Sequence, residues 1–114
     1  MKTKEEKLEA LKLFLKENNI PFEENHYSKS FQVRTCLRIK SLKIAVFFSE
    51  GPEKDSELVH KKNKYGASLN RIYNPFFIRE EETEEFILEK MQNCVFNRMV
   101  KMQKLWQKKQ NKKK

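Results

Sequence analysis

Two neighbouring apolar segments near the middle of the chain constrain the fold most strongly. In residues 31–39 the side chains alternate, with Phe31, Val33, Thr35, Leu37 and Ile39 on one face and polar or basic residues on the other. This period of two is typical of a strand with one buried face. Residues 42–48 follow after a short connection and end in a continuous apolar run, which predicts a strand buried on both faces. Together the two segments predict a β-hairpin.

Amphipathic segments flank this hairpin. In residues 4–19 leucines recur at helical spacing, and Thr3 followed by Glu6 has the spacing of a capping box. Pro21 disfavours helical geometry in the residue before it, so this helix ends near residue 19. Residues 81–107 repeat apolar side chains every three to four positions, begin with glutamates and end with lysines. Both ends complement the helix dipole, which predicts one long C-terminal helix.

Three elements are predicted between the hairpin and the C-terminal helix. Residues 49–55 are expected to form a loop, and a short helix is expected within residues 55–65, with Gly66 at its end. Residues 67–78 are expected to form a strand that is bent or split at Asn74-Pro75. The predicted class is therefore α+β, with an N-terminal helix, a hairpin in a small mixed sheet of three to four strands, a short middle helix and a long C-terminal helix. Residues 1–97 are expected to form a single compact domain that includes the first half of the last helix. Residues 98–114 are expected to be the basic end of that helix and a tail.

Positive charge is concentrated at the C-terminus. The chain has 25 Lys and Arg against 16 Asp and Glu, for a net charge of +9. Eight of the cations and none of the acids follow Asn97, which leaves 17 positive and 16 negative charges in the first 97 residues. A concentrated basic segment indicates a polyanionic partner, such as nucleic acid, or an acidic surface. The plainer interpretation is a solvated tail that aids solubility, since lysine-rich termini are common.

Other features exclude several classes of protein. Cys36 and Cys94 are far apart and lack metal-type spacing, which is typical of free thiols in a reducing compartment. The longest apolar run is too short to span a bilayer, and the first residues lack the apolar core of a signal peptide. We therefore expect a cytoplasmic protein without membrane association. No phosphate-binding glycine loop, paired histidines or other catalytic motif is present, so the sequence predicts no cofactor, no metal site and no catalytic residue.

The order of the predicted elements resembles the small restriction-endonuclease-like fold, in the branch of the very-short-patch repair endonucleases. The resemblance covers about residues 4–95 and rests on residues 31–39, residues 42–51 and Asp55 with the basic residues 61–65. In that branch, carboxylates on the hairpin strands hold Mg²⁺, which activates water against a phosphodiester. Arg34, Phe47 and Ser49 occupy the corresponding positions in this chain. The resemblance thus implies the fold with a degenerate active site.

The first functional hypothesis is a non-catalytic, nucleic-acid-associated protein that binds the phosphate backbone through the basic C-terminal helix. The expected contacts are Arg98, Lys101, Lys104, Lys108 and Lys109, extended by Arg34, Arg38 and Lys40 on the exposed face of the hairpin. Of these, Lys101, Lys104 and Lys108 share one helical face. The choice between DNA and RNA stays open.

Two alternatives belong to other classes. A protein-interaction module or homo-oligomer would use the apolar face of the last helix, formed by Met99, Met102, Leu105 and Trp106. An atypical Mg²⁺-dependent nuclease would use Glu50, Asp55 or Glu57 as ligands, because hard cations prefer carboxylate oxygens.

Overall fold

A computed structural model of the chain describes the backbone of residues 3–112 and, within that range, the side chains other than those of Trp106 and residues 109–112. The elements follow in the order α1 (Lys4–Glu17), β1 (Glu23–Ser28), β2 (Val33–Ile39), the 3-10 turn η1 (Lys40–Leu42), β3 (Ile44–Phe48), α2 (Pro52–Val59), α3 (Leu69–Ile72), β4 (Asn74–Ile78) and α4 (Glu84–Lys112). The predicted α+β class is confirmed.

The strands form one mixed sheet in the order β1-β2-β3-β4. The β1–β2 and β2–β3 pairs are antiparallel and the β3–β4 pair is parallel. The predicted hairpin is β2–β3, with Ile39 opposite Ile44 and Leu37 opposite Val46. Lys43 closes its turn in the left-handed conformation, with φ at 58°. Residues 23–28 form the edge strand β1.

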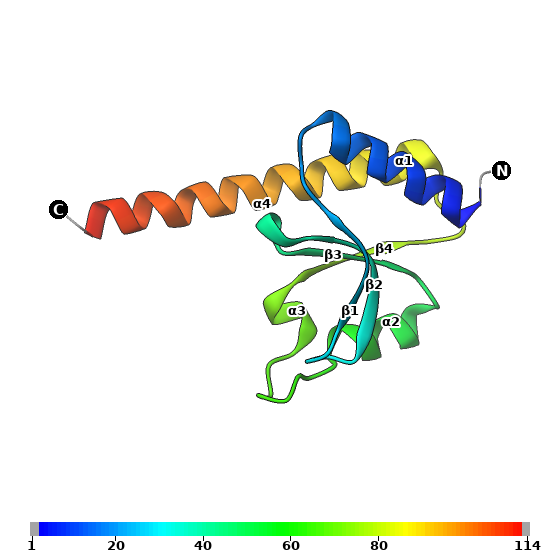
Figure 1. Cartoon of the computed structure of the whole chain (residues 1–114), viewed down its shortest axis with the longest axis horizontal. Helices are drawn as coiled ribbons and strands as arrows, with labels where there is room; N and C mark the ends of the chain where they lie inside the picture. Colours follow the sequence, from blue (N-terminus) through cyan, green and yellow to red (C-terminus); the bar gives the residue numbers. More distant parts are fainter. Residues whose placement is uncertain (1–2, 113–114) are drawn as a thin grey trace.

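Helices cover both faces of the sheet, with α1 and α4 on one face and α2 and α3 on the other (Figure 1). The larger core cluster lies between the sheet and the two helices α1 and α4, and it includes Leu11, Ile44 and Met91. The smaller cluster lies on the sheet face that α2 and α3 cover, where Ala45 and Phe47 of β3 pack near Leu69. Successive β3 residues thus enter opposite clusters, which explains why β3 is apolar throughout.

The middle of the chain differs from the sequence prediction in two ways. The helix α2 begins at Pro52, which suits a first helical position, and it ends well before Gly66. Gly66, with φ at 85°, lies instead in a turn that the Asn63 side chain supports by accepting the Ala67 N–H. Residues 69–72, predicted as strand, form the helical turn α3, and β4 begins only at Asn74. Because β4 is an edge strand, Pro75 is tolerated without its N–H.

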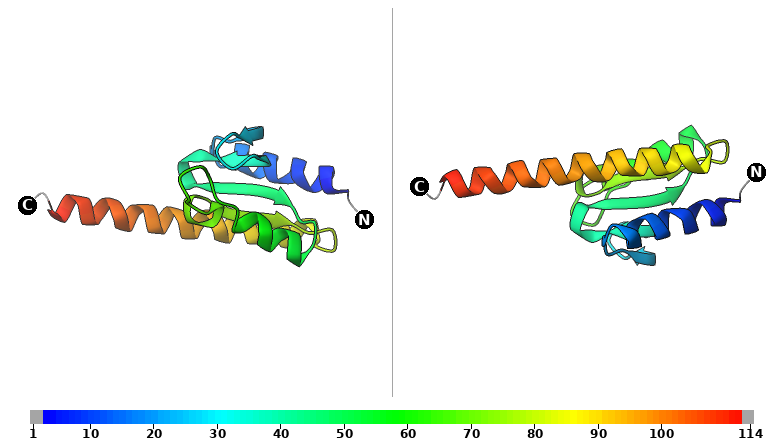
Figure 2. Two further views of the ribbon diagram at one scale, coloured as in Figure 1. Left: turned by 90° about the horizontal axis from the view of Figure 1, so that it is seen from below. Right: turned by 90° about the horizontal axis from the view of Figure 1, so that it is seen from above.

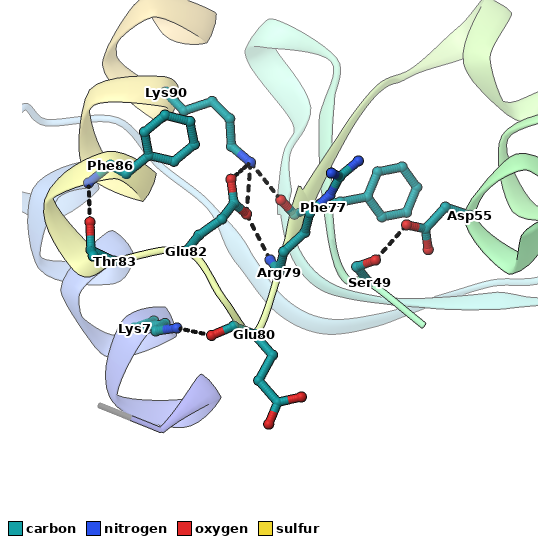
Figure 3. A network of polar contacts seen from close by, with 10 residues as sticks. All are labelled: Lys7, Ser49, Asp55, Phe77, Arg79, Glu80, Glu82, Thr83, Phe86 and Lys90. Atoms are coloured by element: carbon teal, nitrogen blue, oxygen red, sulfur yellow. Dashed lines mark hydrogen bonds and ion pairs between the residues drawn. The ribbon is translucent and has the colours of Figure 1, made fainter. Parts of the chain in front are cut away.

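Helix α4 starts three residues later than predicted and continues far beyond the sheet. Its start is capped by Thr83, whose Oγ1 accepts the Phe86 N–H at 3.2 Å. Residues 80–83 form a loop in which Glu82 accepts bonds from the Arg79 N–H and Lys90 Nζ, both at 2.8 Å (Figure 3). At the other end, the 14 residues after Arg98 span about 20 Å of helix. Both views in Figure 2 show this part of α4 extending past the other elements.

Candidate nucleic-acid interface

Three stretches of the chain, residues 25–49, 58–79 and 90–114, contain no Asp or Glu. They supply η1, α3 and the C-terminal half of α4, which all lie toward the same end of the molecule (Figure 1). The acidic loop at residues 80–82 and the glutamates that begin α4 lie toward the opposite end. The fold therefore gathers cations without acids at one end of the molecule, whereas toward the other end acidic and basic residues are mixed, as in α1.

Arg98 joins α4 to the turn between β2 and β3. Its Nε donates a hydrogen bond of 2.8 Å to the partly buried carbonyl oxygen of Leu42. Lys40 and Lys43 flank Leu42 in this turn, and both side chains are exposed. The structure thus places Lys40, which the sequence predicted as part of the patch, next to the α4 cations and adds Lys43. The sequence prediction missed Lys43, because its position depends on the packing of η1 against α4.

The predicted α4 lysines continue this basic surface beyond the sheet. Lys101, Lys104 and Lys108 are exposed and follow one another at intervals of three and four residues on one face of the helix. The side chain of Lys109 lies outside the described residues. The first lysine of this row is less than one helical turn from Arg98, so the row is continuous with the η1 turn.

The two predicted hairpin arginines are not part of this surface, because they lie on the sheet face opposite α4. Arg38 is only 14% exposed, its Nη2 pairs with Glu23 Oε2 at 2.6 Å, and its Nη1 donates to the Tyr73 hydroxyl at 3.3 Å. Its charge is therefore balanced within the fold. Arg34 is exposed, donates to the Asn25 carbonyl at 3.0 Å and lies over the Tyr27 ring.

The predicted docking face of α4 is partly accessible. Met99 and Leu105 are 46% and 50% exposed, and Met102 is intermediate. The side chain of Trp106 lies outside the described residues. Among the side chains of α4 that the structure describes, the most exposed large apolar one was not predicted, since Phe96 is 65% exposed on the outer face of the helix.

The carboxylates considered for a nuclease line a pocket of about 540 Å³ where β2 and β3 part. Asp55 is engaged there, because its carboxylate accepts the Ser49 hydroxyl at 2.5 Å (Figure 3) and the Glu50 N–H at 3.1 Å. Arg34 and Lys54 lie in the same wall. Within residues 3–112, no three His, Cys, Asp or Glu side chains come together in a way that could hold a metal ion. Asp55 therefore stabilises the loop before α2.

The two free thiols are half-buried. Burial raises the pKa of Cys36 above the ordinary thiol value, and a hydrogen bond with the Phe48 backbone only partly opposes this. Burial also raises the pKa of Cys94, against the opposing effects of the Asn74 amide and of two nearby cations. Both thiols are therefore protonated near neutral pH and are poor nucleophiles.

Comparison with family models, with curated proteins and with solved structures gave no match to this chain. The restriction-endonuclease-like resemblance therefore stays a prediction. None of the described helices combines the length and the apolar composition that a membrane-spanning segment requires.

Proposed function

We propose that this protein associates non-catalytically with nucleic acid through its basic end, with α4 lying along the phosphate backbone. The observation that carries the proposal is that η1, α3 and the C-terminal half of α4, which all belong to stretches without Asp or Glu, lie toward the same end of the molecule. These stretches contain no carboxylate that could compete with a phosphate for the lysines, and Lys101, Lys104 and Lys108 stand on one helix. Such a surface attracts polyanions without reading their sequence.

The spacing of the lysines supports contact with successive phosphates. From Lys101 to Lys108 the helix rises about 10 Å. One strand of a B-form duplex advances about 3.4 Å for each phosphate, so this row is about three phosphates long. Lys40 and Lys43 extend the same positive surface toward the body of the protein. Backbone contacts of this kind predict binding that weakens steeply as salt rises.

The test is fluorescence anisotropy with short single- and double-stranded DNA and RNA at several salt concentrations. The double variant Lys104→Gln with Lys108→Gln should reduce the magnitude of the log–log salt slope on duplex DNA by about 1.8, or about 0.9 for each lost contact. The matched control is Lys16→Gln with Lys54→Gln, which removes two exposed lysines outside the basic end. An equal loss of affinity in both variants would show that only the net charge of the protein matters for binding, and it would refute the proposed interface.

A second candidate function, self-association through α4, is favoured by the exposure of Phe96 and Met99 on neighbouring turns. Exposed apolar side chains that adjoin one another often mark an interface. Sedimentation equilibrium should then show a concentration-dependent dimer that Phe96→Gln abolishes. Leu13→Gln is the matched control, because Leu13 is also exposed but lies on α1. A wild-type protein that stays monomeric at millimolar concentration would exclude this candidate.

A further inference from the structure

The loop between α2 and α3 holds the ring of Tyr65 in solvent. Tyr65 is 79% exposed, more than any other large apolar or aromatic side chain that the structure describes. Hydrogen bonds nevertheless fix the backbone of the loop. Asn63 Oδ1 accepts the N–H groups of Tyr65 and Ala67 at 2.9 and 3.0 Å, and the Asn63 N–H donates to the Ala67 carbonyl oxygen at 2.9 Å. The loop thus presents a large ring that the fold itself does not use.

Cations stand on both sides of this ring. Lys62 and Lys64 are exposed, and residues 58–79 contain no Asp or Glu. Among the residues that the structure describes, neither lysine pairs with a carboxylate. Lys64 Nζ lies over one face of the Tyr65 ring, 5.0 Å from its centroid. Because the side chain is so exposed, the other face of the ring is open to a partner.

The loop is connected to the basic surface of α4 around the end of the sheet. It leads into α3, which carries the exposed Arg71. At the start of β4, the Asn74 N–H donates to the Lys43 carbonyl oxygen at 2.6 Å, beside the bond between Arg98 and Leu42. The loop and α4 lie on opposite sides of the sheet (Figure 1). The cations between them therefore follow a curved path.

A flat open ring and a curved row of cations suit an unpaired strand better than a duplex. In a duplex each base is covered by its neighbours, whereas an unpaired base has a free face that can stack on an aromatic side chain. A duplex is also stiff, with a persistence length of about 50 nm, so bending it around the end of the sheet is unfavourable. A single strand can follow such a surface.

From these observations we propose that the nucleic acid bound at the basic end includes an unpaired segment, one base of which stacks on Tyr65. Lys62 and Lys64 contact the phosphates on either side of that base. This inference rests on the proposed association with nucleic acid and names the class of strand. Stacking on the ring is independent of the base sequence, because every base has a flat face.

The test is fluorescence anisotropy of the full chain with a DNA single strand, a strand of abasic sites of the same length and a blunt duplex. Tyr65→Ala should weaken binding of the ordinary strand at least about fivefold, the smallest effect expected for one stacked base. It should leave the affinities for the abasic strand and the duplex unchanged. The salt slope should also stay unchanged, because tyrosine carries no charge at neutral pH.

Two further variants separate stacking from a general effect of mutation. Tyr65→Phe keeps the ring and should bind the ordinary strand as the wild type does. Phe86→Ala removes another exposed ring, in the acidic first turn of α4, and should leave all three affinities unchanged. The bond from residue 65 to Asn63 uses the backbone N–H, so both Tyr65 variants retain it. In ¹⁵N–¹H spectra of the wild type, the amides of residues 62–66 should shift when the ordinary strand is added.

The outcomes distinguish this inference from the function on which it rests. If Tyr65→Ala binds the ordinary strand like the wild type, or loses equal affinity for the ordinary and abasic strands, stacking is refuted and the association with nucleic acid stands. Spectral shifts confined to α4 would refute stacking in the same way. Absence of binding to all three ligands at low salt would refute both the association and this inference.

Discussion

Arg98 and Leu42, 56 positions apart in the sequence, are joined by a hydrogen bond of 2.8 Å from the guanidinium Nε to the backbone carbonyl oxygen. This bond connects α4 to the turn between β2 and β3 at the place where the helix leaves the sheet. Arg98, which the sequence predicts as a phosphate contact, thus also has a structural role, because its bond to Leu42 orients the projecting half of α4.

Replacing Arg98 should therefore lower stability as well as charge. Arg98→Met keeps an apolar stem but leaves the partly buried Leu42 carbonyl without this donor, which should lower the free energy of unfolding by about 1–3 kcal/mol. Urea denaturation measures the change. Lys101→Met is the control and should stay within about 0.5 kcal/mol of the wild type, because Lys101 is exposed. Equal stability of the two variants would contradict a structural role for the Arg98 bond.

Truncation of an apolar side chain should lower the free energy of unfolding much more on the buried face of α4 than on its outer face. Met91 is fully buried, so Met91→Ala should cost about 2–5 kcal/mol of unfolding free energy. Phe96 is on the outer face, so Phe96→Ala should change the stability of the monomer by less than about 0.5 kcal/mol. Guanidinium denaturation at low protein concentration compares the two. A large loss in Phe96→Ala would show that this ring is covered in the folded protein.

Asp55 should act as a stabiliser of the α2 start and not as a metal ligand. Asp55→Ala removes the acceptor of the Ser49 hydroxyl and of the Glu50 N–H, and should cost about 1–2 kcal/mol. Glu57→Ala, an exposed change in the same helix, serves as control. Thermal unfolding with and without MgCl₂ should give the same midpoint for the wild type. A Mg²⁺-dependent rise that disappears in Asp55→Ala would assign a metal to this carboxylate instead.

The thiols should remain protonated to higher pH in the folded protein than in the unfolded chain, since burial raises the pKa of both Cys36 and Cys94. The rate of alkylation by iodoacetamide should therefore still rise with pH where the rate for the urea-unfolded chain has levelled off. The contribution of the protonated thiols to the free energy of unfolding is fully present at pH values below the ordinary thiol pKa. It is lost as pH rises through the raised pKa of the folded protein. Coincident pH profiles for the folded and unfolded chain would contradict the predicted direction.

Local patterns predict much of this fold. The alternation in residues 31–39 gives the correct buried face of β2, because one half of that strand's residues faces the core. The capping box at Thr3 is confirmed, since its side chain accepts the Glu6 N–H at 3.2 Å. Residues 69–72 were predicted wrongly, because apolar side chains in a single helical turn have no period that distinguishes them from a strand.

The candidate sites could be predicted only in part. Lys101, Lys104 and Lys108 follow from helical spacing, because all three stand on one helix. Arg38 looks equally available in the sequence, yet Glu23 neutralises it across the β1–β2 pair. The place of Lys43 beside α4 depends on contacts between segments that are distant in the chain, and no local period carries such information.

The concentration of positive charge at one end of the molecule has a kinetic consequence. A body whose centre of charge lies away from its centre of mass is turned by the field of a polyanion before the two surfaces touch. The projecting end of α4 would then arrive first, and many of the random orientations that slow an encounter between two proteins or a protein and a duplex would be avoided. Added salt would screen this guidance at distances beyond a Debye length, so the association rate should fall more steeply with ionic strength than the dissociation rate rises.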